Sequence, residues 1–426
     1  MRLADDITAV VFLALWVSTS VATTNVSSSS GAIRCETAVA QSWAGRIALF
    51  DTGKPSAHAA TGNVSPEEQG WIRIEEDQKP ELFRGDAVVV NGRLAVVFRK
   101  GSAGADAYGV SASGLSHRAR LIPMGAGLDG LTISGCKTLQ NDSTDVAVQA
   151  TFEGKSGKAV VVFGLGVGKP FVKTTATFGA TGLRVEAPAR FGVLPDFIAD
   201  DVLVDAAAVA KDRKEVPSNA MFVELTGGGD LLLVTVWDKN ARNVELTFEG
   251  EDEQRVISGV EAPYGAGGSV WFALLEGKGI WHQANVAPGN IGKAVDLNWK
   301  IPFSAEWKCN LQKADYSADS WTFKYHMKDR SQSGATVGAY LYPAWIDGDA
   351  KGEKAHIQTP RYEKSEYTQK YLGLLVVYPI NRAKKQENVA DTPLNQFTVM
   401  DVMRETLGIG PCPGGTFMLM HESLKQ

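Results

Sequence analysis

Short apolar runs with polar breaks dominate the chain between residues 86 and 275. Residues 86–99 (DAVVVNGRLAVVFR) place two β-branched stretches on either side of Asn91-Gly92, which predicts a hairpin closed by a type I′ turn. Similar runs predict further strands at 144–152, 158–163, 172–178, 183–186, 221–225, 230–237, 243–248, 254–257 and 269–275. Turn residues separate these runs, a pattern typical of antiparallel sandwiches and not of βαβ units.

The predicted fold class is therefore all-β, a large antiparallel β-sandwich with a few short helices. The twisted super-sandwich of mutarotase-type domains is one version of it, on strand spacing alone and not on matched motifs. One helix is expected at 205–211 and another at 398–407. In the second, Val399, Val402, Met403 and Thr406 share a face, and Gly408 stands where a C-terminal cap is expected.

The N-terminus has the pattern of an export signal. Residues 9–16 (AVVFLALW) are apolar, and Ser20-Val21-Ala22 follows with the small residues of a cleavage site. We therefore expect a signal peptide at 1–22, a flexible linker at 23–34, a β-sandwich domain at 35–290, and a β-rich, Trp-rich segment at 291–426 that ends in a short helix. The protein would then be secreted or periplasmic; the alternative is an uncleaved terminus that is disordered or forms a strand.

Composition narrows the classes of partner. The 426 residues carry 43 Lys+Arg and 48 Asp+Glu, a net charge of −5, which argues against a nucleic-acid binder because such proteins need a basic surface. After residue 22 no apolar run is long enough to span a membrane. The four cysteines have no CxxC or CxxH spacing, which argues against structural zinc and favours isolated buried thiols.

Two segments resemble ligand sites. Residues 164–170 (GLGVGKP) lack the Ser or Thr and the helix of a phosphate loop, so we interpret them as a turn between strands. Asp200 and Asp201 lie among other carboxylates at 195–205 and are the candidate metal ligands, for Ca²⁺, provided that the chain bends there. The alternative is a turn with solvated charges that protect a sheet edge, and then no cofactor is expected.

Seven of the ten tryptophans lie between residues 237 and 345. Trp237 and Trp271 stand in apolar strand runs and are expected in the core. Trp307 and Trp345 stand among polar, Pro and Gly residues and are the candidates for sugar stacking, since indole faces pack on the C–H faces of sugars.

The catalytic candidates are Tyr325, His326, Tyr342 and Arg361, the residue types that remove and return protons and neutralise a uronate during polysaccharide β-elimination. Glycoside hydrolysis would instead need two nearby carboxyl groups. Two functions follow: an exported polysaccharide lyase or glycoside hydrolase with a groove within residues 296–367, or an exported, non-catalytic β-sandwich that binds glycan or is structural. In both cases the expected partner is a polysaccharide or oligosaccharide.

Overall fold

The structure, a computed structural model, describes residues 45–286 except 61–65, 67–68, 112–113, 195–201, 210, 217–219, 239–242, 266–267 and 278–279, then the backbone of further strands up to residue 381, and residues 397–408. Strands make up 57% and helices 7%, which confirms the all-β prediction with few helices. Every described strand pair is antiparallel.

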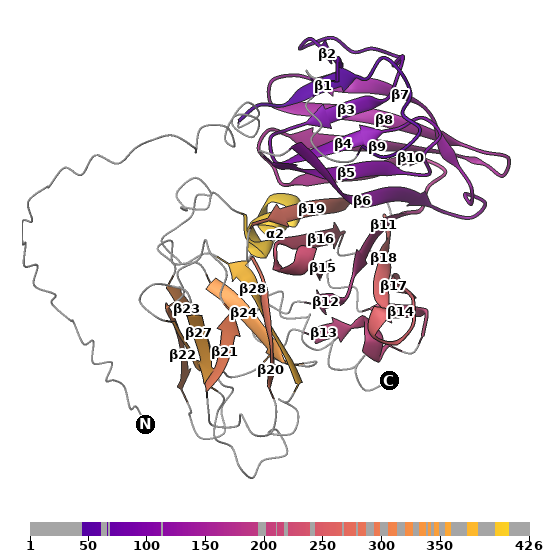
Figure 1. Ribbon diagram of the computed structural model, residues 1–426. Coiled ribbons are helices and arrows are strands. Elements are labelled where there is room, and N and C mark those ends of the chain that lie inside the picture. Colours follow the sequence, from indigo (N-terminus) through magenta and orange to yellow (C-terminus); the bar gives the residue numbers. More distant parts are fainter. Residues whose placement is uncertain are drawn as a thin grey trace, which may run out of the picture. The chain divides into compact units, whose positions relative to one another are not determined.

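Two large sheets form the sandwich (Figure 1). Sheet A has ten strands in the order β14 (Arg213–Val216), β17 (Val244–Glu249), β18 (Val256–Pro263), β11 (Gly182–Ala189), β6 (Gly114–Met124), β5 (Ala105–Ser111), β4 (Leu94–Phe98), β3 (Ala87–Val90), β1 (Ala48–Asp51) and β2 (Ile72–Ile74). Sheet B has nine, in the order β13 (Val202–Asp205), β12 (Phe191–Leu194), β15 (Met221–Thr226), β16 (Leu231–Trp237), β19 (Val270–Glu276), β10 (Phe171–Phe178), β9 (Lys158–Gly166), β8 (Asp145–Glu153) and β7 (Thr132–Asn141).

Three smaller sheets follow in sequence. They are built from β20 (His282–Val286), β28 (Gly373–Asn381), β24 (Gln332–Val337) and β25 (Tyr340–Leu341); from β21 (Ala294–Asn298), β27 (Lys354–Gln358) and β26 (Trp345–Gly348); and from β22 (Glu306–Gln312) and β23 (Ser320–His326). The helical segments are η1 (Ala206–Ala208), η2 (Gly227–Gly229), η3 (Asp252–Gln254) and α2 (Val399–Leu407). The expected helix at 205–211 is thus one 3-10 turn, with Asp205 as its N-cap.

One apolar core lies between sheets A and B. Alternate strand residues supply it, because successive side chains on a strand point to opposite faces. On β11, for example, Leu183, Val185 and Ala187 are buried in this core. Trp237 belongs to it and is fully buried, as predicted.

A second apolar cluster covers the other face of sheet B. Helix α2 supplies Val399, Val402 and Met403, which pack with strand residues that include Val234 and Trp271. Thr398 caps the helix: its hydroxyl accepts from the Asp401 N–H, while the Asp401 carboxylate accepts from the Thr398 N–H. Gly408 closes it at φ 65°, as the sequence pattern predicts.

The Asn91-Gly92 hairpin is present between β3 and β4, but its turn is not type I′. Only Gly92 has positive φ, at 82°, which fits a type II′ turn with Gly at the first central position. Asn91 instead forms hydrogen bonds with its side chain: Oδ1 accepts from the N–H groups of Arg93 and Leu94, and Nδ2 donates to the carbonyls of Gly166 and Lys169. The glycine-rich segment 164–170 is accordingly a turn between β9 and β10, which confirms the prediction for it.

Candidate functional site

The outer face of sheet A is divided into a covered half and an open half. Over β1, β3, β4 and β5, an apolar cluster that includes Phe50 and Tyr108 is packed against Ala60 and Trp71. The N–H of Ala60 donates to the Tyr108 hydroxyl at 3.0 Å, which holds the covering segment in place. The other half, formed by β6, β11, β18, β17 and β14, carries polar and charged side chains.

Strand register arranges these charges in rows. Arg184 of β11 pairs with Ile122 of β6 on one side and with Glu261 of β18 on the other, and Glu261 pairs with Glu245 of β17. Two residues further along β11, Glu186 pairs with Arg120 and with Gly259. Glu186 and Glu261 are therefore diagonal neighbours on one sheet face, a relation that places Cβ atoms about 7–8 Å apart or slightly less.

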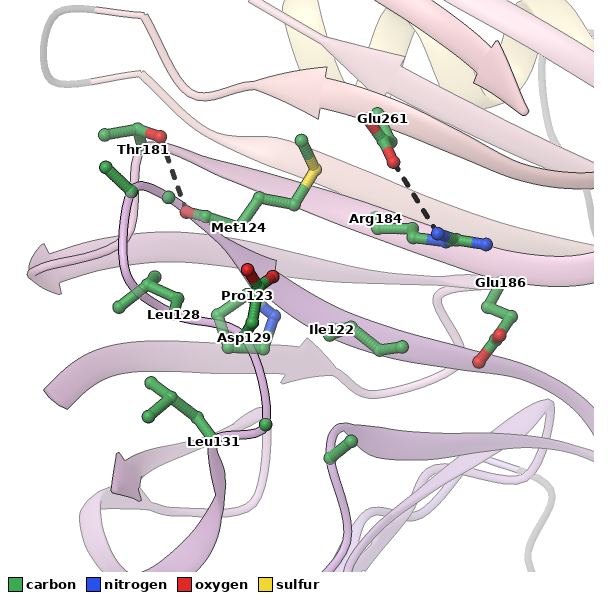
Figure 2. A pocket seen from close by; sticks show the side chains of 14 residues that line it. Ile122, Pro123, Met124, Leu128, Asp129, Leu131, Thr181, Arg184, Glu186 and Glu261 are labelled. Atoms are coloured by element: carbon green, nitrogen blue, oxygen red, sulfur yellow. Dashed lines mark hydrogen bonds and ion pairs between the residues drawn. The ribbon is translucent and has the colours of Figure 1, made fainter. Parts of the chain in front are cut away.

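A cavity of about 560 Å³ opens on this half of the sheet. Figure 2 shows its charged group, in which Arg184 lies between Glu261 and Glu186. An aliphatic wall lies beside them, and none of the 14 lining residues is aromatic. The lining residues are Ala103, Ile122, Pro123, Met124, Gly125, Ala126, Leu128, Asp129, Gly130, Leu131, Thr181, Arg184, Glu186 and Glu261.

Glu261 is nearly buried, with 9% of its surface exposed, and two guanidinium groups contact it. Arg213 donates to both of its carboxylate oxygens, at 3.3 Å from Nη1 and through a shorter contact from Nη2. Arg184 Nη1 lies 3.7 Å from Oε1. The hydrogen bonds to Glu261 and Glu245 raise the pKa of Arg213 above its ordinary value. These contacts hold the Glu261 carboxylate between two guanidinium groups.

Gly259 provides the space in which Arg184 lies. A Cβ atom at residue 259 would be 3.0 Å from Nε of Arg184 and 3.2 Å from the Thr247 hydroxyl, so a larger side chain would press on the guanidinium. Arg184 also lies 3.9 Å from Glu249, and its Nε is buried without a hydrogen-bond partner among the described residues. The guanidinium is thus already shared between two glutamates.

Glu186 differs from Glu261 in its partners. It is half-buried on the cavity wall, and no described residue forms an ion pair with it. Its register partner Arg120 directs Nε to Asp106 instead, at 2.9 Å. The cavity thus contains Glu261, which two arginines contact, Glu186, which has no ion-pair partner among the described residues, and Asp129.

The structure describes the side chains of none of the predicted site residues. Asp200, Asp201, Tyr342 and Arg361 are outside the described residues. For Trp307, Tyr325, His326 and Trp345 the structure describes only the backbone: Trp307 of β22 pairs with Tyr325 of β23, Glu306 pairs with His326, and Trp345 begins β26. Both the predicted groove at 296–367 and the predicted Ca²⁺ site therefore stay predictions.

The sequence analysis did not select Arg184, Glu186 or Glu261. They meet because β11 pairs with β18, and residues 190–255 separate the two strands in the chain. The only local signal was the alternation in residues 183–187 (LRVEA), where charged residues occupy the solvent side of a strand whose other side is apolar.

Within the described part of the chain, no three His, Cys, Asp or Glu side chains gather as metal ligands. Cys136 is a buried free thiol, and burial raises its pKa to about 12. Among the described helices, none has the length and apolar character to span a membrane.

Comparison with known proteins does not assign a family to this chain. No family model and no curated protein matches the chain. One solved structure that resembles it is a glycoside hydrolase of family 81 from Clostridium thermocellum, at 11% identity and a TM-score of 0.25. The match covers 78% of this chain but only 40% of that protein, and a likeness this distant carries no functional argument.

Proposed function

We propose that this protein hydrolyses glycosidic bonds in the cavity on the open half of sheet A. The observation that carries the proposal is the diagonal placement of Glu186 and Glu261 around Arg184 on one sheet face. Glycoside hydrolases use two carboxyl groups, roughly 6.5–9.5 Å apart in inverting enzymes and about 5–5.5 Å in retaining ones. The diagonal relation sets the strand positions of the two glutamates about 7–8 Å apart, and the anomer formed first decides between inversion and retention.

The surroundings of the two carboxyl groups suggest their roles. Arg213 and Arg184 hold Glu261 between two positive charges, a setting that suits a general base that activates water. No described cation pairs with Glu186, so it is the better candidate for the acid that protonates the leaving oxygen. Arg184 orients Glu261 without reacting itself.

The test is hydrolysis of a polysaccharide panel, followed by reducing-end release and by NMR of the first anomer formed. We expect Glu186→Gln and Glu261→Gln to lower kcat by about 10²–10⁴-fold. Glu215→Gln is the matched control, because Glu215 is exposed on β14 and does not line the cavity. Its activity should equal that of the wild type.

Two results would overturn the proposal: release of no sugar from any polymer by the wild type, or full activity of Glu186→Gln. Glu261→Gln removes a buried ion-pair partner and needs a thermal melt beside its activity. Glu186→Gln removes no ion pair among the described residues, so its loss of activity would be interpretable by itself.

We keep a second proposal for the Trp-rich segment at 291–426. In it, Trp307 and Trp345 bind glycan, and Tyr325, His326, Tyr342 and Arg361 act on it. The register of Trp307 with Tyr325, which pairs two aromatic residues across one hairpin, supports it. Trp307→Ala and Trp345→Ala should weaken glycan binding and leave the melting temperature unchanged. A lower melting temperature without loss of binding would instead assign the rings to a core.

Export is also part of the proposal, on the apolar segment and small residues at 9–22. Mass spectrometry of extracellular material should find a mature N-terminus near Thr23. Extracellular protein that still begins at Met1 would contradict a cleaved signal.

A further inference from the structure

Resting on the proposed function, we infer that the sheet A cavity selects uncharged glycans and rejects anionic ones, and that Asp129 at its rim is a determinant of this specificity. The first observation is the charge of the lining. With Glu186 protonated as the proposed acid, two carboxylates, from Asp129 and Glu261, face the cavity, against one guanidinium, that of Arg184.

The charge of that guanidinium is already partly offset by two glutamates. Its Nη groups lie 3.7 and 3.9 Å from Glu261 and Glu249, and its Nε is buried beside Gly259. Arg213 is likewise shared between Glu245 and Glu261. A uronate or sulfate entering the cavity would therefore meet like charges, together with a guanidinium whose positive charge the glutamates already offset.

Hydrogen-bonding capacity leads to the same conclusion. Ionised carboxylates only accept hydrogen bonds, so they are matched by a ligand rich in donors. The hydroxyl groups of a neutral sugar are such donors, whereas an acidic sugar adds acceptors. The aliphatic wall, with Ile122, Met124 and Leu128, can pack against the C–H face of the same ring.

Substitution of Asp129 provides a separate test of this selectivity. It is exposed at the cavity rim, and the only hydrogen bond described there is accepted by its backbone carbonyl, from Ser156. Changing its charge therefore alters the potential at the cavity mouth without breaking a described side-chain contact. It is a positioning and specificity residue, not a catalytic one.

The experiment compares each neutral polymer with its carboxymethylated derivative, which keeps the backbone and adds only anionic groups. We expect kcat/KM to be at least about tenfold lower on the derivative at low salt. Asp129→Lys should reduce that ratio several-fold, and 0.5 M salt should remove its effect because the side chain is exposed.

Glu76→Lys is the matched control, since it makes the same charge change at an exposed residue after β2, at the far edge of sheet A and outside the cavity. Its ratio should stay that of the wild type. Equal or faster hydrolysis of the carboxymethylated polymers would overturn the inference but leave the hydrolase proposal intact. An Asp129→Lys ratio equal to that of the wild type would overturn it too. If neither polymer is hydrolysed, the proposed function itself fails.

Discussion

The carboxylate of Asp106 lies 2.6 Å from Nε of Arg99, and both residues are buried. Arg120 contacts the other oxygen at 2.9 Å, and His117 lies 3.3 Å from it. Burial alone would raise the pKa of Asp106, but the hydrogen bonds from His117, Arg99 and Arg120 outweigh it and hold the pKa below its ordinary value. This cluster joins the covered and open halves of sheet A, because Asp106 is on β5 and Arg120 is on β6.

Asp106→Asn should lower the free energy of unfolding by about 3–5 kcal/mol at pH 7, because it leaves buried Arg99 without its counter-charge. A lowered pKa contributes stability above the ordinary aspartate pKa of about 3.9, and this contribution is lost as the pH falls through the folded-state value. Urea unfolding from pH 7 down to pH 3 measures both effects. The variant should show a shallower acid dependence than the wild type, and equal curves would contradict this account.

Glu224 on β15 is fully buried, and neither carboxylate oxygen has a partner among the described residues. Burial raises its pKa well above the ordinary value. The folded state therefore keeps a proton that the unfolded chain releases above about pH 4.3, so stability falls as the pH rises from there toward the folded-state pKa.

Replacing Glu224 should therefore stabilise the protein. Glu224→Leu should raise the free energy of unfolding by about 1–3 kcal/mol at pH 8, because the unpartnered polar group is removed. Glu224→Gln should remove the pH dependence of this site while keeping the side-chain size. Urea titrations at pH 5 and pH 8 separate the two effects. A Glu224→Leu protein that is less stable than the wild type at both pH values would show that the carboxyl group has an undescribed partner.

Asn91 uses all four of its side-chain hydrogen-bonding positions, two as donor to the 166–169 turn and two as acceptor within its own hairpin. Asn91→Ala should lower the free energy of unfolding by about 4 kcal/mol, because it removes four hydrogen bonds of a buried side chain at roughly 1 kcal/mol each. Asn91→Asp should cost more, because it sets a carboxylate against the carbonyls of Gly166 and Lys169. Thermal unfolding ranks the two variants, and the reverse order would contradict the assigned orientation of the Asn91 amide.

The cap of helix α2 can be tested within one turn of chain. Thr398→Ala removes the hydroxyl that accepts from the Asp401 N–H and should cost about 0.5–2 kcal/mol. Thr406→Ala is the control, because the Thr406 hydroxyl only donates back to the Val402 carbonyl inside the same helix. Its stability should be unchanged, since alanine favours the helix. Equal losses in both variants would refute the capping role.

The elements that could be predicted are those that a short stretch of sequence determines. The hairpin at Asn91-Gly92, the buried Trp237 and the cap residues around 398–408 each depend on neighbours within a few positions. The turn type was wrong because Asn91 lies opposite Leu94, so that Gly92 and Arg93 are the central residues of the turn. In that place the Asn91 side chain bonds to residues 75 and 78 positions away. The pairing of Arg184 with Glu261 was not predicted either, because a short stretch of sequence does not determine the order of strands in a sheet.

The position of helix α2 late in the chain has a consequence for folding during synthesis. The face of sheet B that carries Val234 and Trp271 is complete once the chain reaches β19, yet the helix that covers it begins at Val399. Synthesis at roughly 5–20 residues per second leaves that apolar face bare for several seconds or longer. A nascent chain stalled between β19 and α2 would expose this apolar face to chaperones and to other nascent chains. A chain completed past residue 407 would not.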